Sequence, residues 1–227
     1  MPGTLYVTAT PIGNLGDLSP RAAALLARVE LVVAEDTRHS RRLLQELGAR
    51  PRMLALPAAR ELERVPQVLA ALGRGDVALI SDAGTPAISD PGRRLVAGAR
   101  AAGFRVLALP GPSALAAAVS ASGLRCDRFL FLGFLPRTRG RAQRLLGAGA
   151  EWALVFHESP HRLATTLVWV EEVLGPRRVA VAREISKLHE EWLLGEAAEL
   201  GAMLAQTVVR GECTVVVEAP ARGTGNG

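Results

Sequence analysis

The chain has 227 residues, of which 49% are hydrophobic and 22% are charged, and its formal net charge is +5. This length suits one large or two small α/β domains with a substantial core. No apolar run reaches the roughly 18 residues that a membrane-spanning helix needs, and the first residues lack the pattern of a secretory signal. Cys126 and Cys213 stand apart, which argues against a disulfide framework or a zinc knuckle. We therefore expect a cytoplasmic protein without a membrane segment.

Strand and helix signals alternate along the first half of the chain. Ser19 followed by Pro20 is a helix-start pair, Asp36 or Thr37 can cap the next helix, and Ser89 or Asp90 can cap a later one. Pro66 predicts a break in the helix that contains it. The expected strands cover residues 5–9, 30–34, 52–56, 77–80 and 105–109, and the expected helices cover residues 22–29, 41–47, 61–72 and 91–102.

The second half continues the alternation, and a small-residue helix over residues 114–121 leads into it. The expected strands cover residues 129–135, 152–156, 178–182 and 213–218, with an added strand or hairpin arm over 190–194 and helices over 163–173 and 197–205. Such alternation indicates βαβ units and a mostly parallel sheet. We predict two α/β domains, residues 1–112 and 113–222, followed by a frayed tail over residues 223–227.

Residues 77–92, VALISDAGTPAISDPG, predict a buried parallel strand and the loop at its carboxyl end. Ligands bind at such ends in open α/β sheets. Gly84 lets the backbone approach a ligand, while Pro86 and Pro91 stiffen the loop. Similar loops, TPIGN, PGPSA, FHESPH and AREISK, follow other strands. Together they suggest a cleft for a small molecule, although five unrelated turns would give the same pattern.

Several familiar catalytic motifs are absent or unsuitable. Residues 157–161 read H-E-S-P-H, but a zinc protease needs both histidines on one continuous helix. A strand pattern precedes His157, and Pro160 inside a helix costs about 3 kcal/mol. We therefore expect no metal site. The chain also lacks the common phosphate-binding and dinucleotide-binding fingerprints and the nucleophile elbow of hydrolases.

Basic residues form two clusters that could contact nucleic acid or simply face solvent. One contains Arg38, Arg41 and Arg42, and the other contains Arg137, Arg139, Arg141 and Arg144. Lys187 is the only lysine among 27 Lys and Arg residues. A site that needs a compact amine would resist replacement by arginine, but a single surviving lysine can also be incidental.

Seven segments together resemble the ribosomal small-subunit RNA methyltransferase I family, a branch of the tetrapyrrole methylases. They are LYVTATPIGNLGDLSPRA, VVAEDTRHSRRLL, LISDAGTPAISDPG, LPGPSALAAAVSASGL, FLGFLPR, FHESPHRL and AREISKLHEE. The resemblance implies two α/β domains that enclose S-adenosylmethionine. It also implies methylation of the ribose 2′-oxygen of a cytidine in the decoding region of 16S rRNA, within the small ribosomal subunit. Finally, it implies that the protein is a homodimer.

The resemblance assigns cofactor-binding positions to the strand-end loops. Gly84-Thr85-Pro86 stands where the superfamily has Gly-Asp-Pro, so a backbone role can persist while the aspartate side chain is missing. The implied cofactor-binding residues are Pro11, Asp82, Gly84, Thr85, Ile88, Ser113, Ala114, His157, Glu158, Arg183 and Glu184.

A ribose hydroxyl attacks a methyl group only when its proton is removed or its alkoxide is stabilised. Glu35, Asp36, Arg38, Glu184 and Lys187 are the candidate catalytic residues, and the sequence does not choose one base among them. The seven clustered arginines are the candidate RNA contacts. Two other functions stay open: a methyltransferase of the same fold for a tetrapyrrole or other metabolite, and a non-catalytic RNA-binding assembly factor.

Overall fold

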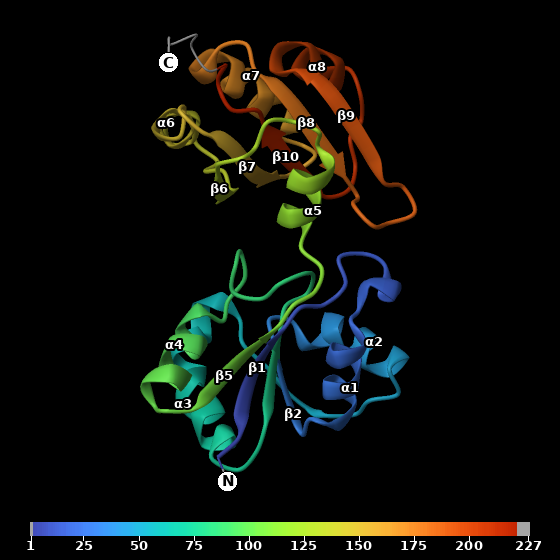
Figure 1. The fold of residues 1–227 in the computed structure, drawn as a ribbon, viewed down its shortest axis with the longest axis vertical. Coiled ribbons are helices and arrows are strands. Elements are labelled where there is room, and N and C mark those ends of the chain that lie inside the picture. The colour runs from blue at the N-terminus through green and yellow to red at the C-terminus, as the bar shows by residue number, and fades with distance from the viewer. Residues whose placement is uncertain (1, 222–227) are drawn as a thin grey trace. The chain divides into compact units, whose positions relative to one another are not determined.

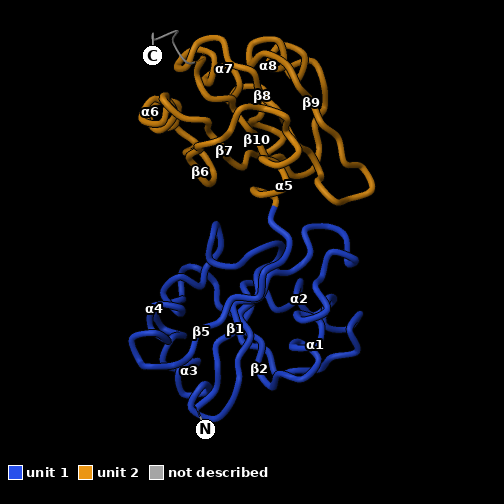
Figure 2. Tube along the Cα trace, viewed as in Figure 1, with its two compact units in different colours: residues 1–113 blue, residues 114–227 orange. Residues whose placement is uncertain are grey.

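A computed structural model describes residues 2–221, and the tail predicted over residues 223–227 lies outside them. The chain divides into two compact units, Met1–Ser113 and Ala114–Gly227 (Figure 2). This division lies one residue from the domain boundary placed by the sequence analysis. Each unit has its own five-stranded sheet and its own core.

The sheet of unit 1 is entirely parallel, as the sequence predicts, and its central strand is buried along its whole length. A strand covered on both faces needs a continuous apolar run rather than alternation, and Val77–Ile80 supplies one. The strand order is β3 (Arg52–Ala55), β2 (Leu31–Ala34), β4 (Val77–Ile80), β1 (Thr4–Thr8) and β5 (Arg105–Leu109) (Figure 1).

Helices cover both faces of this sheet. One core cluster combines Leu25, Leu26 and Leu44 with the strands, and a second combines Val68, Leu72 and Leu95 with their other face. The helices are α1 (Pro20–Arg28), α2 (Thr37–Glu46), α3 (Glu61–Leu72) and α4 (Arg93–Ala101), with short 3₁₀ turns η1 (Leu15–Asp17) and η2 (Ala58–Arg60).

The predicted caps of the first two helices are confirmed. The Ser19 hydroxyl accepts a hydrogen bond from the Ala22 amide at 3.2 Å, and Asp36 accepts one from the Arg38 amide at 2.8 Å. Pro66, in contrast, does not break α3, so that prediction is wrong. Pro66 and Leu62 are both exposed, so water can satisfy the Leu62 carbonyl that proline leaves without a donor.

The predicted cap of α4 is wrong. Neither Ser89 nor Asp90 caps this helix; its N-cap is Gly92, at φ +131°. The buried Glu61 side chain, at the start of α3, accepts hydrogen bonds from the amides of Gly92, Arg94 and Leu95 at 3.0, 2.7 and 3.2 Å. One distant carboxylate therefore replaces a local cap and joins α3 to α4.

The sheet of unit 2 is mixed, which corrects the expectation of mostly parallel strands. Among the strands described, β6 and β7 form the one parallel pair of this sheet. Strand β10 lies antiparallel between β7 and β8, and β8 and β9 form an antiparallel hairpin. The strand order is β6 (Phe129–Phe134), β7 (Ala153–Glu158), β10 (Cys213–Val217), β8 (Arg178–Arg183) and β9 (Glu191–Glu196).

Helices also cover both faces of the second sheet. Helix α5 (Ala114–Ala121) covers one face, while α6 (Arg139–Ala148), α7 (Leu163–Leu174) and α8 (Ala197–Ala205) pack on the other around Phe156 and Leu167 (Figure 1). None of the helices described in residues 2–221 is long and apolar enough to cross a membrane.

Replacing Glu61 with alanine tests the shared cap. The substitution leaves three amides without their acceptor, two of them in buried residues, so we expect the free energy of unfolding to fall by about 1–3 kcal/mol. Urea denaturation measures the change. Glu63→Ala is the matched control, because Glu63 is 63% exposed and pairs only with Arg60 of the neighbouring turn. An equal loss in both variants would contradict the capping role.

Candidate functional site

Three loops meet at the carboxyl edge of the first sheet. The amide of Thr10 donates to the carbonyl of Gly84 at 2.9 Å, and the amide of Gly84 donates back to the carbonyl of Thr10 at 3.1 Å. The Thr85 hydroxyl donates to the carbonyl of Pro112 at 3.1 Å. The loops after β1, β4 and β5 are therefore tied together, and the structure brings the predicted residues Pro11, Gly84 and Thr85 into one cluster.

Gly84 is required at the centre of this cluster. Its φ is +78°, and a Cβ there would lie 3.3 Å from Ile12 and 3.6 Å from the carbonyl oxygen of Pro112. Ala87, in the same loop, adopts φ +64°, a conformation that L-residues rarely occupy. Ile88 follows with its apolar side chain 46% exposed. Strain and exposed apolar surface in one loop are typical of a binding segment.

Carboxylates gather at the same edge. Burial raises the pKa of Glu35, and the charges of Asp90, Asp82 and Asp36 raise it further. Burial, followed by the charge of Asp82, raises the pKa of Asp90 as well. The amide of Asp36 donates to Asp82 at 3.3 Å, which links the loop after β2 to the loop after β4. Such a group of partly desolvated carboxylates favours a positively charged ligand.

The pKa of Asp36 is shifted in the opposite direction from that of its neighbour Glu35. Hydrogen bonds from the Arg38 side chain and amide, with the arginine charge, lower the pKa of Asp36 to about 2. The Arg38 guanidinium lies 3.0 Å from the Asp36 carboxylate. The pKa of Arg38 is raised by the same pair. Asp36 is therefore a helix cap and an ion-pair partner, and Arg38 is a permanent cation.

Two predicted site residues of unit 2 lie at the end of β7. Glu158 is 2% exposed and accepts hydrogen bonds from the Thr166 hydroxyl at 2.7 Å and the Ser159 amide at 2.8 Å, with Arg162 at 3.4 Å. These contacts fix the turn between β7 and α7. His157 Nδ1 lies 3.1 Å from the Thr214 hydroxyl, and burial lowers the pKa of His157.

A network of charges holds the loop that joins β8 and β9. Lys187 lies 2.9 Å from Glu184 and 2.8 Å from Glu212, while Glu184 also accepts from the Glu212 amide at 2.8 Å. Hydrogen bonds from the Glu212 amide and Lys187 lower the pKa of Glu184, and bonds to Glu212 and Glu184 raise the pKa of Lys187 despite partial burial. Arg183 is bound to Glu191 at 2.8 Å. These side chains are engaged within unit 2.

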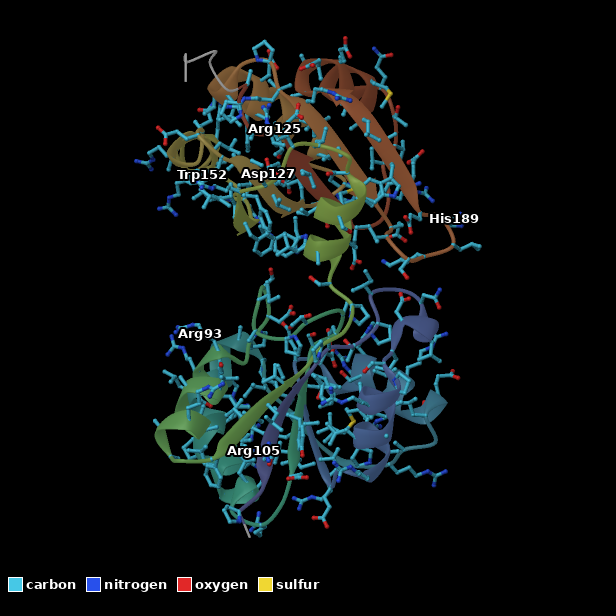
Figure 3. The ribbon with its side chains drawn as sticks, in the orientation of Figure 1. Arg93, Arg105, Arg125, Asp127, Trp152 and His189 are labelled. Carbon is cyan, nitrogen blue, oxygen red and sulfur yellow. The ribbon has the colours of Figure 1, made fainter. Side chains whose placement is uncertain are left out.

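The same loop contains two strained residues. Glu184 adopts φ +52° and Ser186 adopts φ +67°. Gly211 packs against the Glu184 side chain, at a distance that excludes a Cβ. His189 lies near the tip of this hairpin (Figure 3), and the adjacent Leu188 is 93% exposed. The charge network therefore holds a loop that presents its tip to solvent.

Cysteine and metal chemistry receive no support from the described residues. Burial raises the pKa of the Cys213 thiol to about 11 and also raises that of Cys126, so neither is a thiolate at neutral pH. His157 and Glu158 lie on strand β7, so the H-E-S-P-H segment lacks the helix that a zinc protease requires. Within residues 2–221, no cluster of histidine, cysteine, aspartate and glutamate could hold a metal ion.

The clustered arginines belong to two helices, one in each unit. Arg38, Arg41 and Arg42 are exposed on α2, and Arg41 lines a surface hollow with Gln45 and Arg50. Arg137, Arg139, Arg141 and Arg144 are exposed on α6 and the segment before it. Arg139 is bound to Glu172 at 2.8 Å, so part of the second cluster stabilises the contact between α6 and α7.

The predicted residues thus fall into two sets. Unit 1 brings together Pro11, Glu35, Asp36, Asp82, Gly84, Thr85 and Ile88, while unit 2 holds His157, Glu158, Arg183, Glu184 and Lys187. Ser113 ends unit 1 and Ala114 begins α5. The sequence analysis missed Asp90 and Glu212 as members of these clusters. Asp90 could have been found from its place in the loop after β4, which is rich in glycine and proline, whereas the segment before Glu212 carries no such signal.

The chain is similar in sequence to proteins of known family. A family model described as Tetrapyrrole (Corrin/Porphyrin) Methylases matches residues 4–201. Three proteins named ribosomal RNA small subunit methyltransferase I are similar over most of the chain. That of Pseudomonas aeruginosa is 50% identical, covering 95% of this chain and 78% of the relative. That of Escherichia coli O157:H7 is 44% identical, with coverage of 95% and 78%. That of Thermotoga maritima is 41% identical, with coverage of 95% and 98%.

Solved structures with lower identity share the fold. The uroporphyrin-III C-methyltransferase of Thermus thermophilus in complex with S-adenosyl homocysteine matches with a TM-score of 0.67 and 19% identity, covering 95% of this chain and 97% of that one. A cobalt precorrin-4 methyltransferase of cobalamin biosynthesis matches with a TM-score of 0.69 and 15% identity, covering 95% and 94%. The predicted two-sheet α/β fold is therefore confirmed. This chain belongs to the tetrapyrrole methylase family and, within it, to the ribosomal RNA small subunit methyltransferase I proteins.

Proposed function

We propose that this protein is an S-adenosylmethionine-dependent rRNA methyltransferase, and that its target is the ribose 2′-hydroxyl of a cytidine in the decoding region of 16S rRNA. Relatives at 41–50% identity, named ribosomal RNA small subunit methyltransferase I, support the rRNA methyltransferase activity. The resemblance of the strand-end motifs supports the finer target. A cytoplasmic location follows from the substrate, the small ribosomal subunit. A homodimer is part of the same proposal.

The residues at the carboxyl edge of unit 1 fit the methyl donor. S-adenosylmethionine carries a positive sulfonium and an amino group, and it supplies an electrophilic methyl group when bound. The partly desolvated carboxylates Glu35, Asp82 and Asp90 suit this positive charge. Gly84 allows the loops after β1, β4 and β5 to pack closely, because a Cβ there would meet Ile12 and the carbonyl of Pro112. Because Thr10, Gly84 and Thr85 lock the loops together beforehand, little entropy is lost on binding.

The pKa directions separate the candidate bases. Arg38 and Lys187 both have raised pKa values and remain cations at neutral pH. Asp36 and Glu184 have lowered pKa values, which makes them weak proton acceptors. Glu35 alone among the five has a carboxylate whose pKa is raised, and basicity increases with pKa. In our proposal Glu35 accepts the proton of the ribose hydroxyl. At the same time the ribose oxygen bonds to the methyl carbon of the donor, and the bond between that carbon and the donor's sulfur breaks.

Methylation mapping tests the proposed function directly. We expect the purified protein to transfer label from S-adenosylmethionine to 16S rRNA in small subunits isolated from cells that lack the gene, on the ribose of one cytidine. Nucleoside analysis locates the label. Uroporphyrinogen is the matched alternative substrate, because the solved structures that share the fold are named for tetrapyrrole substrates. Label in the porphyrinogen alone would overturn the RNA proposal, and RNA binding without any transfer would identify an assembly factor.

Replacing Glu35 with glutamine tests the proposed base. The amide cannot accept the proton, so we expect kcat to fall about 10²- to 10⁴-fold, with a smaller loss of donor affinity because Asp82 and Asp90 keep their charge. Activity of the wild type requires the ionised carboxylate. Because the pKa of Glu35 is raised, this activity is lost as the pH falls through a value above the usual 4.5. Single-turnover methyl transfer measured across pH checks both points.

Glu46→Gln is the control for this substitution, since Glu46 is exposed at the far end of α2. It removes the same charge away from the loop cluster. A Glu35→Gln variant with unchanged kcat and an unchanged acid limb would show that Glu35 is not the base.

Replacing Arg41 with alanine tests the α2 cluster as a phosphate contact. We expect weaker binding of 16S rRNA and a decrease of about 1 in the slope of log Kd against log salt, with no change in donor affinity. Filter binding at several salt concentrations measures the slope. Arg105→Ala removes an equal charge at the amino end of β5, the opposite edge of the sheet (Figure 3). Equal effects of both substitutions would indicate a general charge effect instead of a contact.

A further inference from the structure

Strand β6 contains a bulge that changes the direction of one aromatic side chain. Phe131 pairs with Val155 and Phe134 pairs with His157, so three steps along β6 correspond to two steps along β7. In a regular strand, residues three apart point to opposite faces. The extra residue instead places Phe131 and Phe134 on the same face of the sheet.

Gly133 makes this bulge possible. Its φ is +63°, the left-handed region that glycine occupies without strain. A Cβ at this position would meet no atom within 4 Å, so the requirement for glycine is one of backbone conformation and not of space. After the bulge, Arg162 donates to the carbonyls of Leu135 and Pro136 at 3.2 and 2.9 Å and fixes the outgoing chain. The strand is therefore held rigidly on both sides of Phe134.

The bulge places Phe134 against an aromatic cluster. The His157 ring lies 5.1 Å from the Phe131 ring at 72° and 5.4 Å from the Phe134 ring at 52°, measured between centroids. Phe131 and His157 are partly buried, whereas Phe134 is 64% exposed. His157 is itself oriented by Thr214 on the other side. The exposed Phe134 ring thus packs against His157, which is itself held by Phe131 and Thr214, and this packing limits the rotation of the Phe134 ring.

Positive charge follows directly along the chain. Arg137, three residues after Phe134, is exposed on the segment that leaves β6, whereas Arg141 belongs to α6, which packs on the opposite face of the sheet. An exposed aromatic ring followed closely by an exposed arginine suits single-stranded RNA, because every base has a face that can stack and because its phosphates pair with arginine. A hydrophobic partner surface would gain nothing from this arginine.

We propose that Phe134 is a stacking platform for an unpaired base of the RNA substrate, held in position by the bulge at Gly133 and by the ring of His157. The proposal rests on the proposed rRNA methyltransferase function and adds to it a residue that recognises the substrate. In this proposal Arg137 contacts a phosphate next to the stacked base.

The test compares three substitutions in the full chain. Phe134→Leu removes the ring but keeps apolar bulk, and we expect the Kd for 16S rRNA to rise on the order of 10-fold. Phe134→Tyr keeps the ring and should stay within about twofold of the wild type, since stacking persists. Phe129→Leu is the matched control, because Phe129 is a 39% exposed ring at the other end of the same strand. Filter binding measures the RNA affinity, and calorimetry measures the affinity for S-adenosylmethionine.

Three results would overturn the proposal. The first is an RNA affinity of Phe134→Leu equal to that of the wild type, and the second is a loss of RNA affinity in Phe134→Tyr as large as that in Phe134→Leu. The third is a Phe134→Leu variant that loses only its affinity for S-adenosylmethionine or only its self-association, as measured by sedimentation. Gly133→Ala provides a second route, since backbone strain should displace the ring and weaken RNA binding while circular dichroism stays that of a folded protein. A methyl-transfer assay of the wild type on the same rRNA separates failure of the proposed function from failure of the platform. If the wild type transfers no methyl group to RNA, the proposed function fails; if it does and Phe134→Leu binds normally, only the platform fails.

Discussion

The position of β1 between β4 and β5 is the constraint on which the candidate site depends. All three strands run parallel, so their carboxyl ends leave the sheet at the same edge. The paired hydrogen bonds between Thr10 and Gly84 then join the first two loops, and the Thr85 hydroxyl joins the third through Pro112. These bonds use backbone groups that would otherwise need water or a ligand. The edge is consequently ordered by the fold itself, which is the condition for binding a ligand at low entropic cost.

Adjacent carboxylates at this edge acquire different properties because their partners differ. Asp36 begins α2 and accepts hydrogen bonds from Arg38, which stabilise its charged form and lower its pKa to about 2. Glu35, one residue earlier, is partly buried and faces three other acids, which destabilise its charged form. Asp36 at the cap position is therefore an ion-pair partner with a lowered pKa, whereas Glu35 at the position before it has a raised pKa. The sequence EDTR contains both residues but does not indicate which carboxylate would be paired.

The parts of the fold that depend on neighbouring residues could be predicted from the sequence. The strands of unit 1, the capping side chains of Ser19 and Asp36, and the loop around Gly84 follow from apolar runs and turn residues. The cap of α4 could not be predicted in this way, because Glu61 precedes Gly92 by 31 residues. The antiparallel course of β10 could not be predicted either, since a strand pattern does not specify its direction. The loops identify the edge that carries the candidate site, whereas distant contacts decide which side chains remain available there.

Unit 2 shows the consequence of those distant contacts most clearly. Glu158, Arg183 and Glu184 lie at strand ends, where the resemblance predicts ligand contacts, and the candidate catalytic residue Lys187 follows in the loop after β8. Their side chains nevertheless bind Thr166, Glu191 and Glu212 of their own unit. A side chain that is already paired must lose that pair before it contacts a ligand, and for the buried Glu158 the cost includes leaving a carboxylate without its donors. Groups that unit 2 offers without such a cost include the exposed Arg137 and the ring of Phe134. In our proposal, recognition by this unit depends on stacking and phosphate contacts, which suit a nucleic acid better than a small acidic metabolite.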